Sequence, residues 1–167
     1  MTYAKDDIRS QLATVAERPI PVHRVDPTTP IRPAQYLALY DTEPTMVSPA
    51  GSKTWLVRGQ HLVFSWTEAV AGDRFARTGH PDEYAVLMYS GSAPVRVSAG
   101  GEQQEVGEEA FIVIPPGDSV VEALADGPVI RVFSTVSDDL AQACANAAAY
   151  AEPDPRCAPL VPWPDPV

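Results

Sequence analysis

The central part of the chain consists of short apolar runs separated by turn residues. The runs are four to nine residues long, and several alternate apolar with polar positions. Both features predict β-strands rather than helices. The predicted strands cover residues 35–40, 53–59, 61–69, 82–89, 95–99, 103–106, 110–114, 120–124 and 129–134. Many short strands at such regular spacing are typical of a β-sandwich or a β-barrel.

Two turns between the predicted strands carry a specific signal. Gly100-Gly101 and Asp126-Gly127 are dipeptides that favour tight hairpin turns. Pro128 follows the second turn and begins a strand, a position where its missing N–H disturbs the hydrogen bonds of a sheet least. We therefore expect a hairpin at each dipeptide.

Apolar side chains of these strands are expected to form the core between two sheets. The residues expected to be mostly buried are Leu62, Phe64, Trp66, Val86, Met88, Phe111, Val113, Val132 and Phe133.

The N-terminal end differs from the strand-rich middle. Ile8, Leu12 and Val15 recur at helical spacing, so residues 5–17 are predicted to form a short amphipathic helix that ends at Pro19. The proline-rich residues that follow are expected to extend along the strand domain as an arm or edge strand.

The C-terminal end combines a helix with a second proline-rich arm. Ser137 is predicted to cap a helix whose first turn carries Asp138 and Asp139, which suit the positive end of the helix dipole. The predicted parts are residues 1–34 (helix and arm), 35–136 (strand domain), 137–152 (helix) and 153–167 (arm or linker). Because the last arm is apolar, we expect it to pack on protein surface, here or on a second subunit.

Composition restricts the partners of the chain. It has 167 residues, which suits one domain, and its 12 basic and 22 acidic residues give a net charge of −10. This charge argues against binding to nucleic acid or to anionic membranes. Cys144 and Cys157 are too few for a disulfide framework, and no run reaches the ~18 apolar residues of a membrane helix. We therefore expect a cytoplasmic protein.

Two segments resemble the conserved motifs of the cupin family. Residues 72–91 read GDRFARTGHPDEYAVLMYSG, which matches both end glycines of the pattern G(X)5HXH(X)3-4E(X)6G. The ligand positions of that pattern fall on Thr78, His80 and Tyr84. A strand slipped by one residue would bring Glu83 to the carboxylate position, but it would move His80 out of ligand spacing.

The second segment, GEEAFIVIPPGDSVVEAL, resembles the cupin pattern G(X)5PXG(X)2H(X)3N. Pro115 and Gly117 are in place, whereas the histidine position falls on Val120 and the asparagine position on Leu124. The resemblance implies an all-β, cupin-type β-sandwich or jelly-roll barrel, often paired into dimers. With one ligand of four retained at His80, it also implies no metal and no other cofactor, because such sites use three or more imidazole and carboxylate ligands.

A narrower resemblance concerns two-cupin proteins, in which one half often keeps the metal ligands and the other is structural. The chain is similar to the N-terminal half of such a protein, and its closing segment resembles a linker into a second barrel. The partners expected on this basis are a second cupin half or, for the chain alone, a second copy in a homodimer.

Several residues are candidates for a site inside the barrel. His80 and Tyr84 could act as general base and acid on a small polar substrate, with His61, which shares the parity of Val63 and Ser65, as a further candidate. The simpler interpretation is that His80 is a polar residue at a strand entrance and that Tyr84 packs in the interior.

Arg74 and Arg77 precede His80 and are the candidates for binding an anionic ligand. The sequence thus favours a metal-free cupin domain with a structural or ligand-binding role. The alternatives are a metal-independent, isomerase-like enzyme and a metal-dependent oxygenase with atypical ligands.

Overall fold

The computed structural model describes residues 26–30, 32–107 and 109–158. In this part of the chain, ten strands pair into two antiparallel sheets, which confirms the predicted all-β sandwich. The strands are β1 (Met46–Val47), β2 (Lys53–Arg58), β3 (Leu62–Ala69), β4 (Arg74–His80), β5 (Tyr84–Met88), β6 (Val95–Ala99), β7 (Glu102–Val106), β8 (Ala110–Ile114), β9 (Gly117–Ala123) and β10 (Gly127–Ser134).

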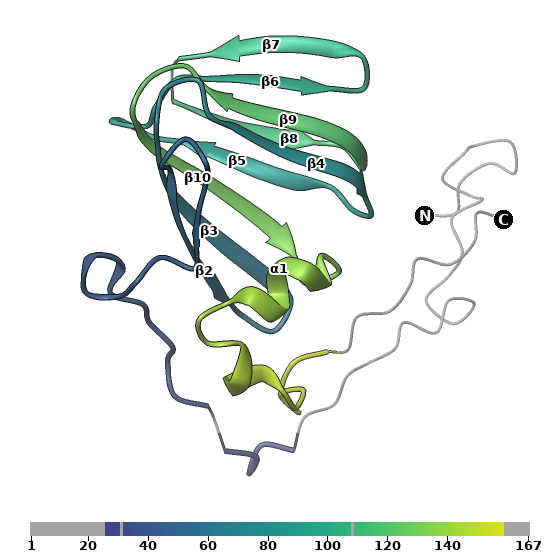
Figure 1. Ribbon diagram of the computed structural model, residues 1–167. Helices are drawn as coiled ribbons and strands as arrows, with labels where there is room; N and C mark the ends of the chain where they lie inside the picture. Colours follow the sequence, from purple (N-terminus) through teal and green to yellow (C-terminus); the bar gives the residue numbers. More distant parts are fainter. Residues whose placement is uncertain (1–25, 31, 108, 159–167) are drawn as a thin grey trace, which may run out of the picture.

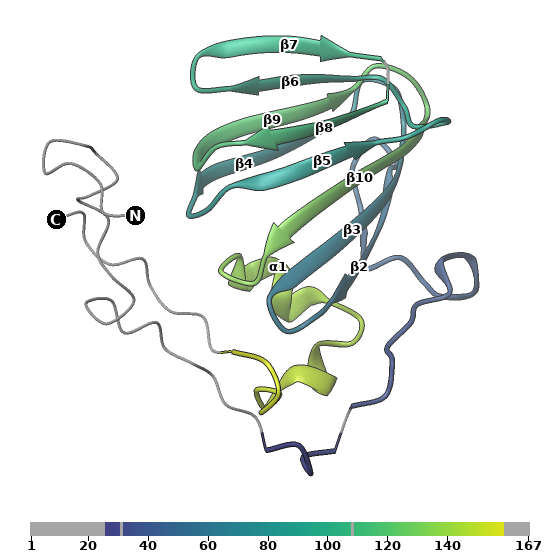
Figure 2. The same ribbon diagram turned by 180° about the vertical axis from the view of Figure 1, so that it is seen from behind.

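The larger sheet has the order β1-β2-β3-β10-β5-β8, and the smaller sheet has the order β4-β9-β6-β7. Figures 1 and 2 show the two sheets facing each other, with helix α1 (Asp138–Ala143) beside β2 and β3. We call the side of each sheet that faces the other sheet its inner face, and the opposite side its outer face.

The core lies between the inner faces and is built mainly from valine. Val63, Val86 and Val129 of the larger sheet are fully buried, as are Val95 and Val121 of the smaller sheet. A β-branched side chain packs well on a pleated surface, and alternation along each strand places every second residue in this core.

Of the residues predicted to be mostly buried, Val86, Met88 and Phe133 are buried, and the other six lie on the outer face of the larger sheet. Phe64, Trp66 and Val132 are half-buried there, whereas Leu62, Phe111 and Val113 are exposed, so the prediction was wrong for these last three. The reason is that strands of this sheet are apolar on both faces, so their hydrophobicity does not indicate which face is buried.

Two strand predictions also differ from the structure. Residues 35–40 form no strand, and Leu39–Asp41 is a single 3-10 turn. The segment Arg74–His80, which is not among the predicted strands, is strand β4 and pairs with β9. Its sequence has little apolar content, so its strand conformation depends on pairing with a neighbour rather than on its own pattern.

One of the two predicted hairpins is present. Gly100 and Gly101 form the two-residue turn between β6 and β7, and their φ angles of 58° and 82° explain the glycines. The Asp126-Gly127 turn instead joins β9 of the smaller sheet to β10 of the larger one.

The C-terminal helix is shorter than predicted. Helix α1 ends at Ala143, and a separate 3-10 turn covers Ala147–Tyr150. Between them, the amide of Asn146 bonds both the N–H and the carbonyl of Arg58, each at 2.9 Å. This pairing with the end of β2 takes the place of helical hydrogen bonds. No helix in the described residues is long and apolar enough to cross a membrane.

The segments at the two described ends bind each other and the barrel. Arg32 forms an ion pair with Asp154 at 3.3 Å, and Arg156 donates to the carbonyl of Thr29. The N–H of Asp154 donates to Gln60 on the loop between β2 and β3. The predicted helix at 5–17 and the end of the C-terminal arm, 159–167, lie outside the described residues.

Candidate functional site

The two motif segments meet at one end of the smaller sheet. His80 of β4 lies opposite Gly117 of β9, and the pairing register shifts between Arg77 and His80. Gly79 has a φ of +55° in this irregularity, and its N–H donates to the Asp118 carboxylate at 2.7 Å. Because the register shift changes the alternation, Arg77 and His80 both contact the inner face although they are three residues apart.

Five polar side chains come together at this point. The Nε of Arg77 donates to Nδ1 of His80 at 3.2 Å, and Nε2 of His80 lies 3.3 Å from the hydroxyl of Ser137. The hydroxyls of Tyr84 and Ser119 are 3.0 Å apart. Ser137 begins α1 as predicted, but its hydroxyl contacts His80 and does not cap the helix.

Phe133 supplies the apolar surface on which these groups rest. Its ring stacks on Tyr84 at 4.7 Å and meets His80 edge-on at 5.7 Å, while His80 and Tyr84 are themselves edge-on at 5.2 Å. His80, Tyr84 and Phe133 are each 2% exposed. The rings therefore hold His80 and Tyr84 in fixed orientations.

A second arginine, Arg131, lies deeper in the interior. Its guanidinium carbon is 4.7 Å from the ring centre of Phe75 and 5.5 Å from that of Phe133. Burial lowers the pKa of Arg131 to about 10, so the side chain is still charged at neutral pH. We call Arg77, His80, Tyr84, Ser119 and Arg131 the interior cluster.

The interior cluster has more positive than negative charge. Arg77 binds the carboxylate of Asp139 on α1 through two hydrogen bonds of 2.7 and 2.9 Å. This contact raises the pKa of Arg77 and lowers that of Asp139. The side chain of Arg131 forms no ion pair and no hydrogen bond with the described residues, and its buried Nε has no partner.

The hydrogen bonds of His80 define its protonation. Burial, and then the nearby Arg77, lower its pKa from 6.5, which favours the neutral ring. Because Arg77 donates to Nδ1, the proton of the neutral ring is on Nε2, where it faces Ser137. Both ring nitrogens are thus engaged, and neither has a free lone pair.

These residues do not fit a metal ion. Arg77 has no lone pair to offer, the nitrogens of His80 are both occupied, and burial raises the pKa of Tyr84, so its hydroxyl stays protonated. Among the described residues, no group of three or more histidine, cysteine, aspartate or glutamate side chains could hold a metal. A first-row metal would lack the imidazole and carboxylate ligands it prefers.

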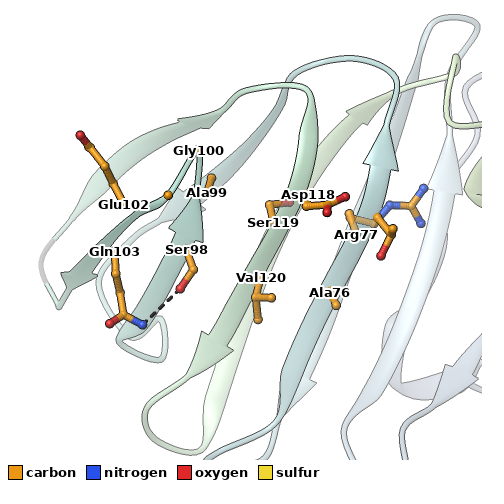
Figure 3. Close-up of a pocket in the computed structure, with 12 residues that line it drawn as sticks. Ala76, Arg77, Ser98, Ala99, Gly100, Glu102, Gln103, Asp118, Ser119 and Val120 are labelled. Atoms are coloured by element: carbon orange, nitrogen blue, oxygen red, sulfur yellow. Dashed lines mark hydrogen bonds between the residues drawn. The ribbon is translucent and has the colours of Figure 1, made fainter.

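Thr78 and Val120, which the motif alignment placed at ligand positions, lie on the other side of the sheet. Both line an outer-face groove of about 470 Å³ on the smaller sheet, together with Ala76, Ser98 and Gln103 (Figure 3). Strand alternation instead turns Ser119 inward, where it is 4% exposed. The other aligned residue, Leu124, follows the end of β9.

The remaining predicted residues have other neighbours. Nε2 of His61 lies 2.6 Å from the carbonyl oxygen of Ala158, and its Nδ1 has no partner among the described residues. It therefore makes no bond to His80. Arg74 is exposed at the start of β4 and is not part of the interior cluster.

Ser119 and Arg131 were not among the residues singled out from the sequence. For Arg131 a signal existed, because it is in phase with Val129 and Phe133 in an otherwise apolar strand. An arginine that shares one face of a strand with two apolar residues is buried when that face is buried. Ser119 stands in a turn-like sequence, and nothing local indicates that it faces Tyr84.

The fold is similar to solved structures of low sequence identity. One is KdgF from Halomonas sp., with a TM-score of 0.52 and 16% identity over 61% of this chain and 94% of that chain. Another is an RmlC-like cupin from Shewanella frigidimarina, with a TM-score of 0.51 and 14% identity over 64% of this chain and 96% of that chain. No protein-family model and no curated protein sequence matches the chain.

Proposed function

On the premise that the chain adopts the RmlC-like cupin fold, we propose that it is a metal-free domain whose barrel interior binds a small polar molecule. The observation that carries this proposal is the interior cluster itself. Five polar or charged side chains converge between the sheets, and Arg131 among them lacks any hydrogen bond to the described residues.

The energetics favour a ligand over a purely structural role. A polar group buried without a hydrogen-bond partner destabilises a protein by roughly 1–3 kcal/mol, and a charged group by more. A domain that served only as a structural partner would gain stability from apolar residues at these positions. A small polar ligand would supply the missing hydrogen-bond partners. Most binding pockets likewise contain a few polar groups that converge on the ligand.

The cluster reaches the surface at the ion pair between Arg77 and Asp139. The side chain of Arg77 is 19% exposed and that of Asp139 is 60% exposed. Asp139 belongs to α1, which packs beside β2 and β3. We infer that a ligand enters next to this ion pair.

Ligand screening by thermal unfolding tests the proposed function. The probes are neutral sugars, polyols and short keto acids, and binding to the folded state raises the melting temperature. We expect at least one probe to do so, with a smaller effect in Tyr84→Phe and Ser119→Ala. Ser98→Ala in the outer groove is the matched control and should respond like the unaltered protein. Absence of any effect across the panel would contradict the proposal.

A metal-independent enzyme is the second candidate function. It is favoured by the edge-on contact of a neutral His80 with a protonated Tyr84. Acting as a base, His80 would accept a substrate proton at Nδ1, and Tyr84 would donate one to a developing oxyanion. Arg77 occupies that nitrogen, so it would have to withdraw first. Turnover of the same probes, followed by NMR and lost in His80→Gln, would establish this alternative in place of simple binding.

The third candidate, a metal-dependent oxygenase with atypical ligands, has the least support from these residues. Elemental analysis of the purified protein addresses it directly. We expect no transition metal near one atom per chain, and a stoichiometric metal that is lost in His80→Ala would contradict the proposed metal-free function.

We also propose a homodimer that forms through the outer face of the larger sheet. Two cross-strand rows on this face are entirely apolar. One row is Val57, Phe64, Val132, Ala85 and Val113, and the other is Trp55, Trp66, Ile130, Leu87 and Phe111.

A second copy of the chain suits this face because of charge. The chain carries a net charge of −10, and the two rows contain none of its acidic residues. Two copies can therefore approach here without opposing carboxylates, and a twofold interface brings the same patch of both subunits together. A second cupin half is the other partner considered. For the compartment we propose the cytoplasm, because Cys144 and Cys157 are both free.

A further inference from the structure

We propose that the ligand carries a carboxylate group, and that the guanidinium of Arg131 and the hydroxyl of Ser65 bind it inside the barrel. This inference rests on the proposed binding function and names the chemical class of the ligand. It depends on the positions of these two side chains and on their lack of hydrogen-bond partners.

Arg131 and Ser65 are direct neighbours on the inner face. Arg131 of β10 lies opposite Ser65 of β3 in the antiparallel register, so their side chains project side by side into the core. Ser65 is 0% exposed and Arg131 is 7% exposed. Both belong to the row that also contains Leu56 and Val86.

Both side chains are without hydrogen-bond partners in the described part of the chain. The hydroxyl of Ser65 and the Nε of Arg131 are buried and unpaired. A comparable pair nearby shows the contrast, since the hydroxyls of Thr54 and Thr67 bond each other at 2.9 Å. Buried polar groups are paired in the large majority of cases, so two adjacent unpaired groups lack a partner that a bound molecule would supply.

The charge balance indicates that this external group is an anion. The interior cluster contains two guanidinium groups, and the carboxylate of Asp139 pairs with only one of them. Asp73 exerts an attraction on Arg131 without forming an ion pair with it, and its carboxylate already accepts hydrogen bonds from Ser48 and from the N–H of Arg74. A chain with a net charge of −10 thus keeps an unpaired positive charge in its core.

The shape of the surroundings favours a carboxylate among anions. Phe75 and Phe133 lie close to the guanidinium and leave its N–H edge as the part that can donate. A guanidinium edge matches a planar carboxylate through two parallel hydrogen bonds. The hydroxyl of Ser65 can donate a third bond. One negative charge on the ligand would neutralise Arg131, whereas a phosphate dianion would leave an excess charge buried.

Thermal unfolding and calorimetry with matched probes test this assignment. The carboxylates are acetate and pyruvate, their neutral analogues are acetamide and methyl pyruvate, and inorganic phosphate represents the other anion class. We expect a carboxylate to raise the melting temperature of the unaltered protein, while its neutral analogue and phosphate do not.

Variants of the two residues make the test specific. Arg131→Met should abolish the carboxylate effect, and it should raise the melting temperature of the ligand-free protein, because it removes an unpaired buried charge. Ser65→Ala should weaken binding about tenfold, and Arg131→Lys should retain part of it. Arg96→Gln, which removes a charge on the outer face of the smaller sheet, should bind like the unaltered protein.

The outcomes separate this inference from the function on which it rests. If neutral sugars or polyols bind and Arg131→Met does not affect them, the barrel is a binding site but the carboxylate assignment is wrong. If phosphate binds and carboxylates do not, the anion class is wrong. If Arg131→Met lowers the melting temperature and leaves carboxylate binding intact, Arg131 is a structural residue stacked on Phe75 and Phe133. If no probe binds, both proposals fail.

Discussion

At the scale of single residues, the surroundings decide what each arginine and each aromatic ring does. Arg77 and Arg131 both lie near Phe133, yet Arg77 is paired with Asp139 and Arg131 is unpaired. Phe133 is buried under Tyr84, while Phe111 is 66% exposed on the opposite face of the same sheet. Residue type alone indicates neither outcome.

The pH dependence of stability should depend on His80. Its pKa is held below 6.5 in the folded protein, so the unfolded chain takes up a proton at a higher pH than the folded chain does. Stability from the neutral ring is present above pH 6.5 and is lost as the pH falls through the folded pKa. Urea unfolding between pH 7.5 and 5 should show this loss, and His80→Gln should remove it.

Carboxylates do not obscure this pH window. Asp139 has a pKa lowered from 3.8 by its contact with Arg77, so its contribution is lost only at still lower pH. Equal slopes of stability against pH for the unaltered protein and His80→Gln would mean that the His80 ring is freely protonated in the fold.

Two phenylalanines provide a matched pair for the assignment of inner and outer faces. Phe133→Ala removes a ring that is 2% exposed and should destabilise the fold by about 3–5 kcal/mol. Phe111→Ala removes a ring that is 66% exposed and should change the stability of the monomer by about 0.5 kcal/mol or less. Urea unfolding at low protein concentration measures both, and a reversed order would show that the faces are wrongly assigned.

At the scale of elements, the larger sheet is apolar on both of its faces. Its inner face packs against the smaller sheet, and its outer face presents Leu87, Phe111 and Val113 to solvent at 37%, 66% and 54% exposure. Exposed apolar patches of this kind often mark protein–protein contacts. Helix α1 contributes differently, because it brings Ser137 and Asp139 to the interior cluster.

A charge placed in the outer rows should prevent dimer formation. Phe111→Glu adds a carboxylate to a face on which a second copy would add another, so the two would repel and lose apolar contact. Light scattering after size-exclusion chromatography should give a dimer mass for the unaltered protein and a monomer mass for the variant. Gln104→Glu, which adds the same charge to exposed strand β7, should remain a dimer.

Other results of this experiment would identify other occupants of the face. A monomer mass for the unaltered protein would contradict the homodimer. In that case a second cupin half is the partner that remains for this face.

At the scale of the whole molecule, the chain segments on either side of the barrel hold each other in place. Arg32 donates to the carbonyls of Ala149 and Glu152 and pairs with Asp154, while Arg156 donates back to Thr29. These contacts join residues more than 100 positions apart in sequence. They are partly exposed, so they are expected to open more easily than the core.

Removal of Arg32 should open the C-terminal segment locally. In Arg32→Ala, a loss of about 1 kcal/mol of local stability should make the half-buried Cys157 react about fivefold faster with a thiol reagent. Cys144 should stay slow, because it is buried and its pKa is raised to about 11. Lys53→Ala, at the exposed first residue of β2, is the control, and an unchanged rate at Cys157 in Arg32→Ala would refute the local opening.

The sequence by itself determined most of the strands and the family resemblance. Short apolar runs bounded by turn residues, such as 61–69 and 129–134, identify β-strands because run length and flanking turns are local properties. Gly100 and Gly101 identify a turn because the two-residue turn itself requires positive φ angles, which is also a local property. His80, Tyr84 and Arg77 were found because they lie within or next to a recognisable spacing.

Only the tertiary structure decided which faces are buried and which polar groups meet. The strand at 129–134 is apolar in both phases, so the packing of the second sheet selects Val129, Arg131 and Phe133 for the interior. Strand alternation turns Arg77 and Ser119 inward in place of Thr78 and Val120, and the register shift after Arg77 then brings His80 to the same inner face. Arg131 and Ser65 are 66 positions apart in the chain. Their contact arises from pairing of β3 with β10, an interaction that no local sequence pattern encodes.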